Sequence, residues 1–224
     1  MAGIATMVLG LIMLNIFPTS ADLPEGFRTP IIAFEFAKVE ADLGYMAGDN
    51  PEAVANRQKM DAGMQWDMFF PIAYAALLGL LLLDLAFRGH TIAWPGIAVA
   101  VLIFPFDIYE NLTLLEITRA LDASAATEAI LERLQLATWL KWGAIAITMA
   151  VLSVALFVDK QKAFAILAGI TAMSIAVCWL SGSNPLAAEI MSGLSSVFFL
   201  AFSVKAGLMA WREIKAVSVN GDPE

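Results

Sequence analysis

Two carboxylates and an amide close an apolar stretch of this sequence at helical spacing. Asp107, Glu110 and Asn111 stand at positions i, i+3 and i+4, so they share one face of a helix just after Pro105. They fall where a membrane span would meet water, and ionisable groups at that depth are costly enough to mark a functional site. Hard cations take oxygen ligands, which these residue types supply. We predict a site for a cation, a proton or a polar headgroup here, joined by Asp67.

Simpler interpretations exist for each of these groups. The cluster can pair with Lys141 or Arg133, or can be solvated at the interface. Lys141 either neutralises Asp107 or Glu110 inside the bundle or extends to the headgroups, as lysines near span ends commonly do. Glu189 either faces the same cavity or lies in a first helical turn, where the helix dipole favours a carboxylate. The candidate ligand-binding residues are Asp107, Glu110, Asn111, Asp67, Lys141 and Glu189.

The composition is that of a membrane protein. Hydrophobic residues make up 60% of the 224 residues and charged residues 15%, against about 45–50% and ~25% in soluble domains. The length allows several spans of about 20 residues each. The net charge of -8 argues against nucleic acid as a partner, because phosphate binding needs basic patches.

Few residues of this chain suit a cofactor or a catalytic centre. Cys178 and His90 are each the single residue of their type, which excludes an internal disulfide and a multi-histidine zinc or haem site. Met60, Met64 and Met68 have a spacing that can bind Cu(I), but a methionine-rich tail and a Cys–His partner are missing. We expect no metal, no cofactor and no catalytic residue, although paired carboxylates in an apolar pocket can do acid–base chemistry.

Hydropathy and helix signals predict one all-α membrane domain over residues 1–224. Six spans are expected, at residues 3–19, 68–87, 92–110, 137–158, 163–180 and 186–210. Residues 1–21 can also be interpreted as a cleavable signal, although a basic leading region is missing. Two helical segments, 30–66 and 112–135, are expected to fold over the outer end of the bundle.

The first outer segment has the period of an amphipathic helix. Thr29 is expected to cap it, with Pro30 at its first position. Its apolar face comprises Ile32, Phe36, Val39, Leu43 and Met46, with Glu35, Lys38 and Asp42 opposite. Asn50 and Pro51 predict the start of a further helix.

Charge and aromatic patterns predict the orientation. The basic residues Arg88, Lys160, Lys162, Arg212 and Lys215 would flank one side of a six-span bundle, which the positive-inside rule makes cytoplasmic. Both termini are then cytoplasmic, most simply in a bacterial plasma membrane, and the acidic connections face outward. Trp66, Trp139, Trp142 and Trp179 are expected at the outer interface, and Trp94 and Trp211 at the inner one.

Short motifs resemble a known family over residues 1–158. These are Phe69-Phe70-Pro71-Ile72-Ala73 entering a span, an acidic span end, and Glu132-Arg133-Leu134 before the next span. Their order resembles the sterol-isomerase and sigma-2-receptor family, whose membrane bundles enclose an acid-lined cavity for a sterol or an amine. This chain has no acid in its first span, where that family carries one, and adds two spans, so no site residue is carried over. Phe34-Glu35-Phe36-Ala37 is also similar to uncharacterised bacterial membrane proteins.

Three hypotheses follow. The first is a non-enzymatic protein whose outer acidic cavity, roofed by residues 30–66, binds or passes a lipid-like or cationic ligand. The second is an accessory subunit that docks other membrane subunits through its arms. The third is a membrane enzyme that acts on an apolar substrate through its carboxylates. Membrane lipids are expected partners in each case.

Overall fold

The computed structural model describes residues 1–19 and 21–220, with side chains as far as Trp211. In chain order the elements are α1 (Ala2–Ile16), α2 (Pro30–Glu35), the 3-10 helix η1 (Glu40–Met46), α3 (Pro51–Asp67), α4 (Phe70–Phe87), α5 (Ala93–Asp122), α6 (Glu128–Val158), α7 (Lys162–Leu180) and α8 (Pro185–Asn220). Ser20, the polar tail after Asn220 and the side chains of Arg212 and Lys215, which entered the sequence predictions, lie outside the described part.

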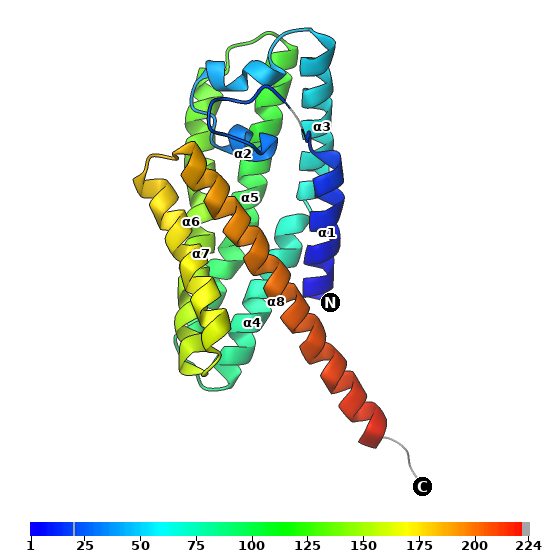
Figure 1. The fold of residues 1–224 in the computed structure, drawn as a ribbon, viewed down its shortest axis with the longest axis vertical. Coiled ribbons are helices and arrows are strands. Elements are labelled where there is room, and N and C mark those ends of the chain that lie inside the picture. The colour runs from blue at the N-terminus through cyan, green and yellow to red at the C-terminus, as the bar shows by residue number, and fades with distance from the viewer. Residues whose placement is uncertain (20, 221–224) are drawn as a thin grey trace.

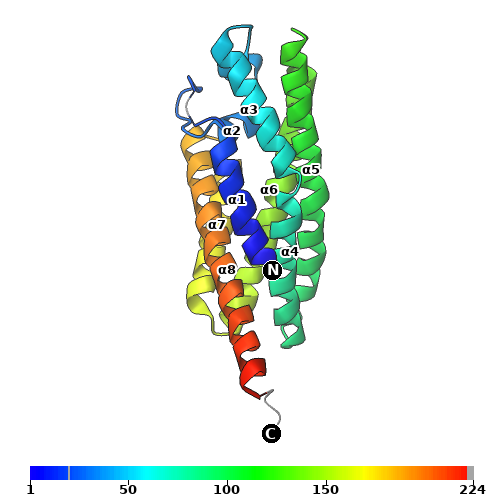
Figure 2. The same cartoon turned by 90° about the vertical axis from the view of Figure 1, so that its right-hand side faces the viewer.

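The predicted all-α polytopic membrane architecture is confirmed. Five helical stretches of the described chain are long and apolar enough to cross a membrane: α3–α4 taken together, α5, α6, α7 and α8. The helix α1 is apolar but has only 15 residues, about 22 Å of rise. It packs lengthwise against α4 and α8, beside them in Figure 2.

The bundle has two different ends (Figure 1). We call the end that carries α2 and η1 the upper end, and the end with the α4–α5 and α6–α7 turns the lower end. Helices α5 and α6 have 30 and 31 residues, about 45 Å of rise against a hydrocarbon core of ~30 Å. Their upper halves therefore continue past the bundle and, with α2, η1 and α3, form a cap. The helix α8 crosses the bundle and projects beyond its lower end.

Two separate apolar cores result. The bundle core contains residues of all five helices from α4 to α8, among them Leu78, Met149 and Phe198. The cap core includes Phe34 and Leu114 and is built from α2, η1, α3, α5 and α6. Ile31 packs against both cores, and the charged residues of the candidate site described below belong to neither.

The outer segment is not one amphipathic helix. It is divided into α2 and η1, because the Asp42 carboxylate accepts the backbone N–H groups of Lys38 (2.8 Å) and Val39 (3.1 Å) and so turns the chain. The apolar residues serve both cores: Phe36 packs in the bundle core and Leu43 in the cap core, while Val39 is 55% exposed. A single straight helix presents one apolar stripe and cannot fill two cores in different directions.

The start of α3 matches its sequence signal. Asn50 Oδ1 accepts the N–H of Ala53 at 2.9 Å, and Pro51 takes the first helical position. The helix ends at Asp67 and α4 begins at Phe70, with Pro71 in its first turn. Because proline has no N–H to donate to the preceding turn, the chain bends there instead of continuing as one helix.

Ion pairs join the lower turns. Asp84 and Arg88 form an ion pair at 2.8 Å, and Arg88 also contacts Asp159 at 2.7 Å. His90 lies 3.0 Å from Asp159 through Nε2. These contacts tie the α4–α5 turn to the α6–α7 turn.

Arg57 is expected to be the main polar contribution to the stability of the cap. Its buried guanidinium donates to the carbonyl oxygens of Met46 and Gly48 and to Asp122. Replacement by methionine (Arg57→Met) removes the donor from the two carbonyl oxygens inside the cap and from Asp122, and should lower the free energy of unfolding by about 2–4 kcal/mol. Thermal unfolding in detergent is the measurement. The matched control is Arg133→Met, because that side chain pairs with Glu116 at the surface and should leave the melting temperature unchanged. Equal melting temperatures for the two variants would contradict this assignment.

Candidate functional site

The residues that the sequence singled out on α5 turn into the protein. Asp107 is 3% exposed, Glu110 fully buried and Asn111 1% exposed. Their helical spacing keeps them on one inward face, and Pro105 lies inside α5 two residues before Asp107. They point into the space between the bundle core and the cap core.

Lys141 comes from α6 and resolves the two alternatives for its side chain. The ammonium group forms ion pairs with Glu110 and, at 3.0 Å, with Glu35. The side chain is buried, so it does not extend to the headgroups. The reason is local: two carboxylates inside the protein lie within reach of this long side chain.

Glu35 is the residue that sequence reasoning placed wrongly. It was expected on a polar outer face, but its side chain is buried and accepts the indole N–H of Trp142 at 3.1 Å. Thr138 donates its hydroxyl to the Glu35 backbone oxygen at 3.0 Å. Trp142 is accordingly buried rather than part of an aromatic belt. One feature of the sequence could have indicated the burial of Glu35: it is the single charged residue in the apolar run of residues 30–37.

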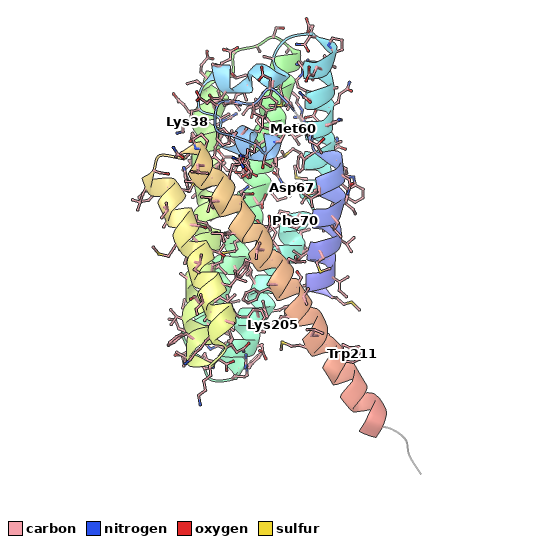
Figure 3. The ribbon with its side chains drawn as sticks, viewed as in Figure 1. Lys38, Met60, Asp67, Phe70, Lys205 and Trp211 are labelled. Atoms are coloured by element: carbon pink, nitrogen blue, oxygen red, sulfur yellow. The ribbon has the colours of Figure 1, made fainter. Side chains whose placement is uncertain are left out.

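Tyr74 and Asp67 complete the cluster from the α3–α4 side. The Tyr74 hydroxyl donates to Asp107 Oδ2. Asp67, at the end of α3, is in electrostatic contact with Asp107 and Asn111 and is only half-buried; Figure 3 shows it between Met60 and Phe70. We call the whole group the acidic layer: Glu35, Asp67, Tyr74, Asp107, Glu110, Asn111 and Lys141.

The acidic layer has more negative than positive groups. It contains four carboxyl groups and one ammonium group, so its charge would be 1 − 4 = −3 if every group were ionised. Several buried polar atoms have no hydrogen-bond partner: Asp107 Oδ1, Glu110 Oε1 and both amide atoms of Asn111. A buried charge is stable only when it is paired or neutralised. The layer therefore needs further positive charge.

Helix geometry gives the depth of the acidic layer. Asp107 lies 14 residues above the start of α5 and Lys141 17 residues above the end of α6, which correspond to about 21 and 26 Å of rise. With a hydrocarbon core of ~30 Å measured from the lower turns, both lie in its upper third. Asp67, 20 residues before the end of α4, lies near its upper boundary, next to the exposed Trp66.

Glu189 does not join the acidic layer. Its Oε1 accepts the backbone N–H groups of Arg28 and Thr29, both at 2.8 Å, and its Oε2 accepts the Thr29 hydroxyl at 2.7 Å. Thr29 is thus used for this contact and does not cap α2 with its side chain. Lys38 donates to the Gly182 carbonyl on the same side. These contacts fasten the α2 segment to the upper end of α7 and α8.

The described residues do not form a metal cage at the acidic layer. Among the described residues, no three His, Cys, Asp or Glu side chains gather closely enough to hold a metal ion. Two grooves, of about 500 and 450 Å³, run along the outer faces of α6–α7 and α7–α8, and apolar side chains line most of both. Neither groove includes a residue of the acidic layer.

No family model, characterised protein or solved structure matches this chain. The resemblance to the sterol-isomerase and sigma-2-receptor family stays a prediction, and the site has to be interpreted from its own geometry.

Lys141 is expected to be the main stabiliser of the acidic layer. Its replacement by methionine (Lys141→Met) leaves Glu35 and Glu110 without a cation and should cost about 3–5 kcal/mol at neutral pH. Because a protonated carboxyl is neutral, the deficit should shrink as the pH falls. Adding Glu110→Gln to Lys141→Met should recover part of the loss. Chemical unfolding in detergent at several pH values measures both effects. A deficit that is independent of pH and unchanged in the double variant would assign the loss to packing alone.

Proposed function

We propose that this protein is a non-enzymatic membrane protein whose acidic layer binds and releases a small cation, and that this cation is the proton. The observation that carries the proposal is the charge imbalance of the layer: four buried or half-buried carboxyl groups face a single lysine, with buried oxygen atoms left unpartnered. Ionisable groups inside a membrane bundle are typical of proton relays.

A proton fits this site better than a larger cation. A metal ion needs several oxygen ligands at about 2.0–2.6 Å, and the carboxylates of the described chain do not converge in that way. An organic cation or a lipid needs a chamber, whereas the two grooves described above lie on outer faces of the bundle and include no residue of the acidic layer. A proton needs only an oxygen atom, and Asp107 Oδ1 and Glu110 Oε1 are available.

The packing of the α2 segment favours this proposal over an accessory subunit. A docking arm would leave its apolar face bare, but Ile32 and Phe36 are buried against this chain's own bundle. As part of the same proposal, the lower end faces the cytoplasm of a bacterium, because the turns at that end carry Arg88, Lys160 and Lys162. Membrane lipids then cover the exposed apolar faces of the spans.

Infrared spectroscopy across a pH titration tests the proposal. The protein in lipid nanodiscs should show protonated carboxyl groups at neutral pH, with their signal changing as the pH rises. Asp107→Asn and Glu110→Gln should each remove part of this signal, since they replace an acid by an amide of similar shape. The control Glu116→Gln changes a half-exposed carboxylate on α5 and should leave it intact. A spectrum without protonated carboxyl groups, or one in which Na⁺ replaces the effect of pH, would overturn the proposal.

A further inference from the structure

We propose that protons reach the acidic layer only from the upper end of the bundle, that Asp67 is the residue through which they pass, and that an aromatic column below Tyr74 closes the lower route. This inference rests on the proton-binding function proposed above and adds its direction of access.

Asp67 is the member of the acidic layer that meets the surroundings. The other carboxyl groups of the layer are buried, whereas Asp67 is half-buried and follows the exposed residues Gln65 and Trp66. Its depth, about 30 Å above the end of α4, is that of the upper interface. An exchanging proton needs a group between the surroundings and the buried acids, and the half-buried Asp67 is the carboxyl group of the layer with this exposure.

The charged groups around Asp67 come from three elements. Asp107 on α5 is the carboxyl group that acts on it most strongly, Lys141 on α6 is the cation that acts on it, and Glu35 on α2 adds a further negative charge. Asn111 contributes an amide from α5. A proton on Asp67 can thus move to Asp107, whose second oxygen, Oδ1, is free to accept it.

The cap closes the more direct route from above. Glu35 is held by Lys141 and Trp142, and the segment that carries it is fixed by Glu189. Above it lies the cap core, where Phe34 and Leu134 are fully buried. Polar groups buried in the cap, among them the Tyr45 hydroxyl and the Arg57 guanidinium, already donate to backbone carbonyl oxygens.

Below the acidic layer, a chain of aromatic contacts runs along the bundle, with Phe198 and Phe202 buried and Phe199 and Phe164 partly buried. Tyr74 contacts Phe199 with ring centroids 5.0 Å apart, and the contacts continue through Phe198 (5.4 Å) and Phe202 (4.3 Å) to Phe164 (5.2 Å). Lys205 lies 4.5 Å from the Phe164 ring centroid, and its ammonium donates to Gln161 in the lower turn; Figure 3 shows Lys205 low on α8. We call these five rings the aromatic column.

The buried hydroxyl groups beside this column do not bridge it. Ser195 and Ser203 on α8 have unpartnered hydroxyls, but they are eight residues apart, about 12 Å along the helix. That separation is far beyond a hydrogen bond of 2.5–3.0 Å. Thr148 and Thr171 donate to carbonyl oxygens of their own helices.

The role of Asp67 is tested by separating the rate of proton exchange from its extent. In nanodiscs, a pH jump followed by time-resolved infrared spectroscopy gives both quantities for the layer carboxyls. Asp67→Asn should slow the exchange at least tenfold while Asp107 and Glu110 still titrate, and Asp67→Glu should restore the rate. The matched control is Asp61→Asn. Asp61 also lies on α3 but is not part of the acidic layer, and its carboxylate accepts the Thr118 hydroxyl. An unchanged exchange rate in Asp67→Asn would show that protons do not pass through Asp67. If the carboxyl groups of the layer do not titrate in the unmodified protein, the proposed function itself is overturned.

The sidedness is tested in sealed vesicles. An exposed cysteine at the upper end (Asp49→Cys) reports, through an impermeant thiol reagent, the fraction of molecules whose upper end faces outward; native Cys178 is buried. A pH jump in the outer solution should change the carboxyl signal of that fraction only, and a protonophore should then recruit the rest. If the carboxyl signal changes in the molecules whose upper end faces inward, or in all molecules, access is not one-sided.

The aromatic column is tested in the same vesicles. Phe199→Ala should let the outer pH jump change the carboxyl signal of all molecules, and Phe199→Leu, which keeps most of the side-chain volume, should not. Equal behaviour of the two variants rules out the aromatic column as the barrier.

Discussion

The ion pairs of Lys141 hold together parts of the chain that are far apart in sequence. Through Glu110 and Glu35 this one side chain joins α6 to α5 and to α2. All three groups are buried, so none can replace its partner with water. Because α2 is only six residues long, it cannot be stable by itself, and its place over the bundle depends on this pair and on the Glu189 contacts.

The separation into two cores follows from helix length. Helices α5 and α6 exceed the thickness of a hydrocarbon core by roughly 15 Å, so their upper parts need protein partners in place of lipid. The cap core supplies these partners. The acidic layer lies where the two environments meet, which is the depth at which charged groups are least costly in a bundle and still close to the aqueous side.

A polar layer of this kind contributes little to stability compared with an apolar one. Replacing buried ion pairs by well-packed apolar groups is often neutral or stabilising, and here several polar atoms lack partners altogether. The excess of carboxyl groups over lysine makes the layer still less favourable as a structural element. Under the proposed function, the layer would change its proton content, and the aromatic column below it would keep the two sides of the membrane separate.

Much of the architecture is contained in the sequence. Apolar runs of span length and the signals at Asn50, Pro51 and Glu128 predict the helices, since they depend on local chemistry alone. The spacing of Asp107, Glu110 and Asn111 likewise predicts a shared helix face. What the sequence did not decide was the direction in which side chains from distant segments point. Glu35 has the pattern of a solvent-facing residue and Lys141 that of an interfacial one, yet each is buried by the other. Only tertiary structure settles such cases, because the free energy of burying a charge depends on whether its partner arrives from another helix.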